Sequence, residues 1–211
     1  MAANLVAARE AAEAFRAEHI RGKPFDGSFP LDVVFVADNV LRLDLIDFPG
    51  LEEMFGSAAY VTASLTELYV DEALMSAYSS RSAPPWRKDR LRFSVAHEIG
   101  HIWMHKELVP KIRCQTIEDL KTLFNANDAQ RNDIEKEANE FAGRLIVPMD
   151  KLKEAAAAFG KMSGDPKWRD SGELRARFCE QCGPHFGINS EGLRVRLDRE
   201  YVWPAEWTTG G

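Results

Sequence analysis

Residues 94–101 limit the possible folds and functions of this chain more than any other segment, because they contain the pattern His97-Glu98-x-x-His101. On a helix, residues four apart lie on the same face, one turn from each other. Two neutral imidazoles in that arrangement can bind one Zn²⁺, and the neighbouring carboxylate can take a proton from a metal-bound water. The sequence therefore predicts His97 and His101 as zinc ligands and Glu98 as a general base.

The residues around this pattern have helical periodicity. At 100° per residue, one side of the predicted helix is apolar, with Val95, Ala96, Ile99, Ile102 and Trp103. The other side carries His97, His101 and His105. The pattern predicts a helix whose back is buried and whose three imidazoles face a cleft.

The sequence also predicts the surroundings of two other residues of this helix, Gly100 and His105. Gly100 lowers helix propensity by roughly 1 kcal/mol relative to Ala, so we expect another chain segment or a substrate to pass close to it. His105 lies roughly 12 Å along the helix from His97 at 1.5 Å per residue. Because one zinc ion cannot bridge that separation, we expect His105 to line the wall of the cleft.

Composition limits the classes of protein that this chain can be. Of its 211 residues, 45% are hydrophobic and 28% charged, which is typical of a globular protein with a real core. A formal charge of -6 argues against a nucleic-acid-binding protein. Three cysteines without framework spacing suit a reducing compartment. Glu10 and Glu13 interrupt the N-terminal apolar run, and no apolar run approaches ~18 residues, so we expect a cytoplasmic protein without a membrane span.

Apolar patterning before the motif predicts helices and a small sheet. Residues 4–20 and 33–40 are expected to be helical, with Asp32 near the start of the second helix. Alternating or β-branched segments predict three short strands, at 41–45, 59–63 and 68–70. Together they suggest a small sheet laid against the histidine-bearing helix.

Two segments beside the predicted cleft have expected roles. The strand at residues 67–71 is expected to form the edge of the cleft, where unpaired backbone groups could hold an extended peptide, unless a loop covers that edge. Residues 79–92 are polar and basic and contain prolines, which predicts a solvated loop. Binding to an acidic partner surface is the alternative for this loop. A short helical pattern is expected at 117–124.

A third zinc ligand is expected from residues 133–146, which have the pattern of a second amphipathic helix. On a helical wheel, Glu135 lies about 60° from the centre of the apolar stripe and Glu137 about 100° from it, while Glu140 falls on the solvated side. Glu135 is therefore the predicted ligand, with Glu137 left open as an alternative. Asn139, one turn on, can hydrogen-bond a ligating histidine.

These two segments together resemble the ImmA/IrrE family of metallopeptidases. The resemblance rests on residues 92–101 followed by His105, and on residues 135–148, and extends loosely over 28–150. It implies an α+β, zincin-like core with a small sheet packed on the helix of the His-Glu-x-x-His pattern. It also implies zinc held by His97, His101 and Glu135, with Glu98 as the base. Family members typically cleave a helix-turn-helix repressor, which derepresses mobile-element or stress genes.

The C-terminal part of the sequence predicts a small helical extension. Helices are expected at 149–159, 174–182 and 190–201, with residues 183–187 between the last two. We expect two units, with the N-terminal helix and metallopeptidase core at 1–150 and the extension at 151–211. Cys179 and Cys182 with His185 suggest a second zinc site, but without a fourth ligand buried thiols are the favoured interpretation.

The sequence thus favours a cytoplasmic, gluzincin-like zinc endopeptidase that acts on a protein, with no direct nucleic-acid or membrane partner. The alternative is a non-catalytic metal-binding sensor or regulatory protein that binds a repressor through the same fold. A DNA-associated regulator is disfavoured by the net charge. Tyr78 and His105 are both candidates for stabilising an oxyanion, and the oligomeric state stays open.

Overall fold

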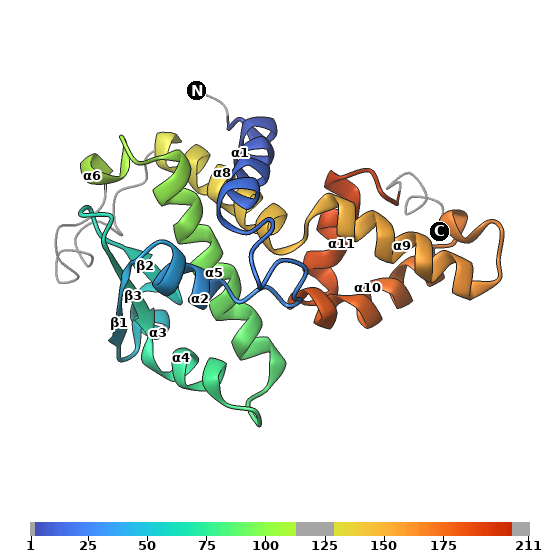
Figure 1. The fold of residues 1–211 in the computed structure, drawn as a ribbon, viewed down its shortest axis with the longest axis horizontal. Helices are drawn as coiled ribbons and strands as arrows, with labels where there is room; N and C mark the ends of the chain where they lie inside the picture. The colour runs from blue at the N-terminus through green and yellow to red at the C-terminus, as the bar shows by residue number, and fades with distance from the viewer. Residues whose placement is uncertain (1–2, 113–128, 204–211) are drawn as a thin grey trace.

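Two packed helices form the centre of the molecule. The structure, a computed structural model, describes residues 3–112 and 129–203. Helix α5 (Pro85–Met104) carries the histidines, α8 (Ala129–Ile146) packs along it, and α1 (Leu5–His19) lies on α8 (Figure 1). The observed α1 confirms the helix expected at 4–20.

Apolar side chains fill the junction of these three helices. The ring of Phe15 on α1 makes edge contacts with Trp103 of α5 and Phe141 of α8, at centroid distances of 5.3 and 5.8 Å. Gly100 faces the same phenyl group, because a Cβ added to it would lie 3.0 Å from Cδ1 of Phe141. The segment that passes close to Gly100 is therefore α8, and the missing side chain lets the two helices approach each other.

The chain forms a mixed three-stranded sheet. Strand β3 (Glu67–Asp71) lies in the middle, parallel to β1 (Asp44–Phe48) and antiparallel to β2 (Ala59–Val61). The expectation that residues 67–71 form the edge of the cleft is therefore wrong, since both sides of β3 are paired. Strands β2 and β3 both contact α5, and β2 packs against it more extensively.

The helix before the sheet explains why β1 begins later than expected. Asp32 caps α2 (Val33–Phe35) by accepting a hydrogen bond from the N–H of Phe35, which confirms the expected helix start. The chain then continues as a π-helix, η1 (Val36–Val40). A turn follows in which Arg42 has a φ of 59° and the N–H of Leu43 bonds to Ala37. Residues 41–43 are used in this turn, so the strand starts at Asp44.

The prediction of a polar loop over residues 79–92 is wrong for most of its length. Helix α3 (Leu51–Phe55) precedes β2, and α4 (Glu72–Ser79) follows β3. Helix α5 then begins at Pro85, because proline fits the first turn of a helix. Two of its basic residues are anchored by other segments: Arg90 pairs with Glu52 at 2.6 Å, and Arg92 is buried against the carbonyls of Leu31 and Gly187. Arg87 is exposed, as expected for a solvated segment.

The chain after α8 forms further helices that extend to one side of the core (Figure 1). They are α9 (Met149–Ser163), a short 3₁₀ turn η3 (Trp168–Asp170), α10 (Gly172–Phe186) and α11 (Ser190–Arg199). The break expected at 183–187 is wrong in part, since α10 runs through Pro184 to Phe186. Gly183 lets the chain after α10 pack closely on the helix, because a Cβ there would lie 2.8 Å from the carbonyl oxygen of Ile188.

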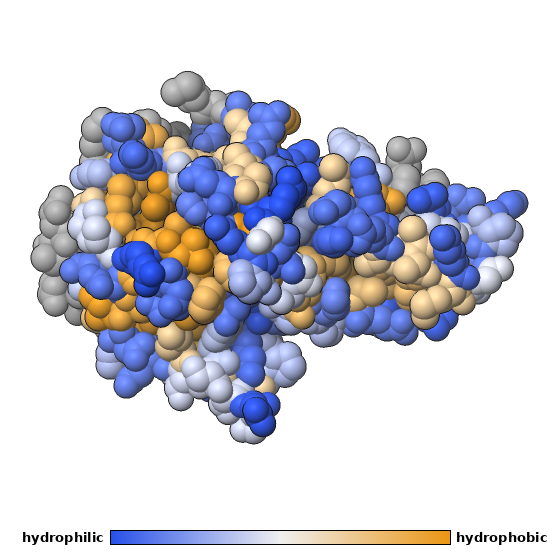
Figure 2. All heavy atoms as spheres, viewed as in Figure 1, coloured by the Kyte–Doolittle hydropathy of each residue, from blue (hydrophilic) through white to orange (hydrophobic). Residues whose placement is uncertain are grey.

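The described chain is thus α+β, mostly helical with a small sheet, and this architecture is compatible with a zincin-like core. A short helix, α6 (Val109–Ile112), follows α5, and the helix expected at 117–124 lies outside the described residues. On the face seen in Figure 2, hydrophobic residues gather over α2 and the sheet. Of the described helices, none is long and apolar enough to cross a membrane.

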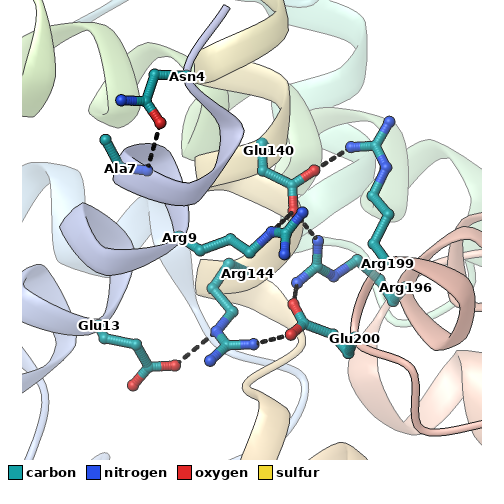
Figure 3. A network of polar contacts seen from close by, with 9 residues as sticks. All are labelled: Asn4, Ala7, Arg9, Glu13, Glu140, Arg144, Arg196, Arg199 and Glu200. Carbon is teal, nitrogen blue, oxygen red and sulfur yellow. Dashed lines mark hydrogen bonds and ion pairs between the residues drawn. The ribbon is translucent and has the colours of Figure 1, made fainter.

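A buried ion network ties α1, α8 and α11 together (Figure 3). Glu140 of α8 is fully buried, so the prediction that it lies on a solvated side is wrong. Its carboxylate accepts from Arg9 at 2.9 Å, from Arg196 at 2.8 Å and from Arg199. Burial opposes ionisation of Glu140, but the Arg196 and Arg199 guanidinium groups outweigh it and lower its pKa. The helical wheel missed this contact because both faces of α8 are covered.

Candidate metal centre

Three predicted ligands from two helices meet at one point. His97 and His101 lie one turn apart on α5, with their Nε2 atoms 2.9 Å from each other. Glu135 of α8 places Oε2 at 2.9 Å from Nε2 of His97 and 3.4 Å from Nε2 of His101. The structure therefore brings the two imidazoles and this carboxylate within contact of one another.

Hydrogen bonds on the outer side of each imidazole determine where its proton lies. Nδ1 of His97 lies 3.0 Å from the amide oxygen of Asn139, so Nδ1 is the donor. This contact confirms the expected role of Asn139. Nε2 of His105 lies 3.0 Å from the Glu137 carboxylate and donates to it. Nδ1 of His105 then accepts from Nδ1 of His101 at 3.1 Å.

This proton arrangement is what a cation site requires. With both Nδ1 atoms protonated, the two Nε2 atoms direct lone pairs inward, where they meet the acceptor-only oxygen of Glu135. Tetrahedral bonds of about 2.0–2.1 Å separate ligand atoms by about 3.3 Å, close to the observed 2.9–3.4 Å. Two neutral nitrogens and one carboxylate oxygen suit a divalent metal ion, so the residues present fit such an ion.

Glu98 lies beside these ligands and is held by the sheet. Its carboxylate and the nitrogens of His97 and His101 lie within 4.8 Å of one another. The side chain is buried, and the N–H of Val61 on β2 donates to its Oε2 at 3.0 Å. Strand β2 therefore orients the carboxylate that the sequence predicts as a base. Sequence periodicity does not reveal this contact, because it depends on how β2 packs against α5.

The expectation that three imidazoles face a cleft is wrong for two of them. His101 and His105 are buried, and only His97 keeps 14% of its side chain exposed. His105 is not a cleft-wall residue, because it lies between His101 and Glu137. Glu137 also accepts from the N–H of Asn4 at 2.6 Å. Glu137 thus bonds to His105 and Asn4, whereas Glu135 is the acid beside the Nε2 atoms of His97 and His101.

Tyr78, the other residue expected to stabilise an oxyanion, makes contacts of a different kind. Its hydroxyl donates to Asp32 at 3.1 Å, and its ring lies against the guanidinium of Arg92. Burial and the nearby carboxylate raise the pKa of Tyr78 well above its usual range. These contacts join α4 to the start of α2 and hold the hydroxyl on a helix cap.

The cysteine pair of α10 does not form a metal cluster. Within the described part of the chain, His97, Glu98 and His101 are the group of His, Cys, Asp or Glu side chains close enough to hold a metal ion. Cys179 is buried, and burial raises its pKa to about 11. The ring of His185 contacts the rings of Phe29 and Phe186. This environment supports the interpretation of Cys179 and Cys182 as thiols packed against the core.

Comparison with known families agrees with the geometry. Residues 86–196 match the IrrE N-terminal-like domain, a peptidase family. The matched segment covers more than half of the 211 residues and includes His97, Glu98, His101 and Glu135. No curated protein matches the sequence. The family match and the meeting of the two motif helices lead to one conclusion: the chain belongs to the ImmA/IrrE family of metallopeptidases.

Proposed function

We propose that this protein is a zinc-dependent endopeptidase of the gluzincin-like type. The observation that carries the proposal is the convergence of three lone-pair atoms, from His97, His101 and Glu135, beside the buried carboxylate of Glu98. Two imidazoles and one carboxylate are a ligand set of catalytic zinc sites. When bound, zinc polarises a scissile carbonyl and lowers the pKa of a coordinated water.

The residues around the site have distinct roles in this proposal. Glu98 accepts the proton of the attacking water and passes it to the leaving amine. The N–H of Val61 donates to its Oε2 and so fixes the orientation of the carboxylate. Asn139 and His105 keep the Nδ1 protons of His97 and His101 in place, so that both Nε2 atoms stay available as ligands.

The substrate proposed from the family is a helix-turn-helix transcriptional repressor. Family membership supports this choice, and it would place the protein in transcription regulation and the stress response of the cytoplasm. The reaction is cleavage of the repressor chain, with no nucleic-acid or membrane partner. We retain the division into a core at 1–150 and a helical extension at 151–211 as part of this proposal.

Substitution of Glu98 by Gln tests the reaction. We expect Glu98→Gln to bind zinc as the wild type does and to lose peptide cleavage, because an amide cannot accept the water proton. Zinc content is measured by elemental analysis of the purified protein. Cleavage is measured by incubating the enzyme with a mixture of denatured proteins as substrates and counting their new termini by mass spectrometry.

The matched control is Glu53→Gln, which makes the same change at an exposed position of α3 and should cleave normally. If Glu98→Gln generates the same new termini at the wild-type rate, the proposed mechanism is wrong. If the zinc-loaded wild type generates none from any substrate, including a repressor, the non-catalytic sensor is favoured instead.

A further inference from the structure

A groove lies beside α11, and its lining includes Asn139, the hydrogen-bond partner of His97. It has a volume of about 590 Å³ and is lined by residues of α5, α8 and α11. On α5, Trp86 and Phe93 precede His97 by eleven and four residues, spacings that place all three on one helix face. On α8, Asn139 and Gly143 follow Glu135 at successive turns. The groove therefore continues along the helix faces that carry two of the predicted ligands.

The metal centre is accessible at Glu135 and His97, and a neighbour of His97 lines the groove. The side chain of Glu135 is 33% exposed and that of His97 14%, whereas His101 has no exposed surface. Asn139, which bonds His97, is exposed and lines the groove. A peptide lying across the metal centre on the side of Glu135 and His97 can thus extend directly into the groove.

The groove wall is positively charged, although the whole chain carries a formal charge of -6. Three of the four charged residues in the wall are arginines. The fourth, Asp89, is neutralised by Arg92, whose Nη1 donates to it at 2.7 Å. Arg90 is paired with Glu52. The remaining two, Arg196 and Arg199, belong to the buried network around Glu140.

That network contains more positive than negative groups. Its four guanidinium groups face three carboxylates (Figure 3), and its members are Arg9, Arg144, Arg196, Arg199, Glu13, Glu140 and Glu200. Arg199 is 41% exposed and lines the groove. Beside it, Nε of Arg196 is buried and has no hydrogen-bond partner among the described residues. Of the guanidinium groups in this network, that of Arg199 is therefore the one that a ligand in the groove can reach.

Apolar side chains make up another part of the wall. Trp86 is 60% exposed at the start of α5, and Phe93 and Val195 lie in the wall with it. An exposed tryptophan close to desolvated arginines is typical of a surface that binds another protein chain. The ligand that fits this wall combines an apolar side chain with a carboxylate.

We propose that the groove binds an acidic residue and its apolar neighbours in the substrate peptide, with the acidic side chain at Arg199. This proposal rests on the proposed endopeptidase function and adds a preference for one kind of peptide sequence. A carboxylate there accepts charge-assisted hydrogen bonds from the exposed part of the Arg199 guanidinium and balances the excess positive charge of the network. The apolar neighbours pack against Trp86 and Phe93.

Binding of short peptides to the zinc-loaded Glu98→Gln protein tests this proposal without interference from cleavage. The probes are fluorescein-labelled peptides with one central residue between two leucines, which is Glu, Gln or Lys in otherwise identical sequences. Measured by fluorescence anisotropy, the Glu peptide should bind about tenfold more tightly than the Gln peptide, with the Lys peptide weaker still. Trp86→Ala should weaken binding of the Glu and Gln peptides to a similar degree.

Arg199→Gln and Arg9→Gln form a matched pair of variants. Each removes one guanidinium from Glu140, but Arg199 lines the groove and Arg9 does not. Arg199→Gln should abolish the preference for Glu over Gln, and Arg9→Gln should keep it.

Equal binding of the Glu, Gln and Lys peptides would overturn the groove proposal, as would an unchanged preference in Arg199→Gln. The readout is binding, so it is independent of turnover. Charge-selective binding by a protein whose wild type cleaves nothing would support the groove and reject the endopeptidase. Cleavage by the wild type without charge-selective binding would support the endopeptidase and reject the groove proposal.

Discussion

At the scale of single residues, the metal centre depends on side chains that do not touch the cation site. The N–H of Asn4 bonds to Glu137, Glu137 accepts from His105, and His105 accepts from His101. This chain of hydrogen bonds keeps the proton of His101 on Nδ1 and its Nε2 lone pair directed at Glu135. Partners of this kind commonly change metal affinity by 10–100-fold.

Substitution of Glu137 by Ala should weaken zinc binding by about 10–100-fold while the three predicted ligands stay in place. Without the carboxylate, His105 no longer has a fixed tautomer, and the His101 ring loses its orientation. Affinity is measured by competition with a zinc-binding indicator dye. The matched control is Asp133→Ala, which removes an acid of α8 that pairs with the exposed Lys136. Equal affinities for the two variants would show that the hydrogen-bond chain has no role in metal binding.

At the scale of elements, the end of α10 is joined to α5 through Arg92. Nη1 of Arg92 donates to the carbonyl of Gly187 at 3.0 Å, and Nε donates to Leu31 at 3.3 Å. Gly187 has a φ of +72°, and a Cβ there would lie 2.3 Å from Nη1 of Arg92. Gly164, at the end of α9, has nearly the same φ of +70° but nothing within 4 Å of such a Cβ.

Substituting alanine at these two glycines therefore distinguishes two costs. At Gly164 alanine adds only backbone strain, whereas at Gly187 it adds the same strain and a steric clash with Arg92. Gly164→Ala should destabilise the protein by about 1 kcal/mol, the cost of a left-handed alanine. Gly187→Ala should destabilise it by about 1–3 kcal/mol more, because the new methyl group displaces a buried guanidinium. Both values come from urea denaturation monitored by circular dichroism. Similar losses in the two variants would mean that the contact with Arg92 contributes nothing.

These elements also show where sequence patterns succeed and where they fail. Periodicity predicted α1 and the two motif helices, because each has an apolar stripe that local spacing reveals. It placed residues 67–71 at the edge of the sheet, whereas β3 is central. A short apolar strand has the same pattern in either position, since strand order depends on pairing between distant segments.

At the scale of the whole molecule, Glu140 connects three helices that are far apart in the sequence. It accepts from Arg9 of α1 and from Arg196 and Arg199 of α11. Removing one member of a buried ion network leaves the others uncompensated, which costs about 3–5 kcal/mol in typical cases. The position of α11, and therefore the wall of the groove, depends on this residue.

Replacing Glu140 by Gln should lower the free energy of unfolding at neutral pH by about 3–5 kcal/mol. The pKa of Glu140 is lowered in the folded state. Its stabilising effect is therefore present above the unfolded pKa of about 4.3 and is lost as pH falls through the folded value. The wild type should lose stability over that acidic range, and Glu140→Gln should lose less. Urea denaturation at a series of pH values measures both effects.

The matched control is Glu191→Gln, which removes an exposed carboxylate that pairs with Arg194 on the same helix. Exposed ion pairs contribute little to stability, so this variant should unfold like the wild type. If Glu140→Gln lowers the free energy of unfolding no more than Glu191→Gln does, the buried network has no structural role.

Local patterns in the sequence were enough to predict the family and the pairs of residues that share a helix face. His97 and His101 share a face of one helix, and Glu135 and Asn139 share a face of another, because helical spacing is a local property. The fold was needed to show that Glu135 rather than Glu137 lies beside the two Nε2 atoms, that Glu137 and His105 support the ligands, that β2 holds Glu98, and that Glu140 is buried. These contacts join segments distant in sequence, and packing between elements, which no local pattern encodes, brings them together.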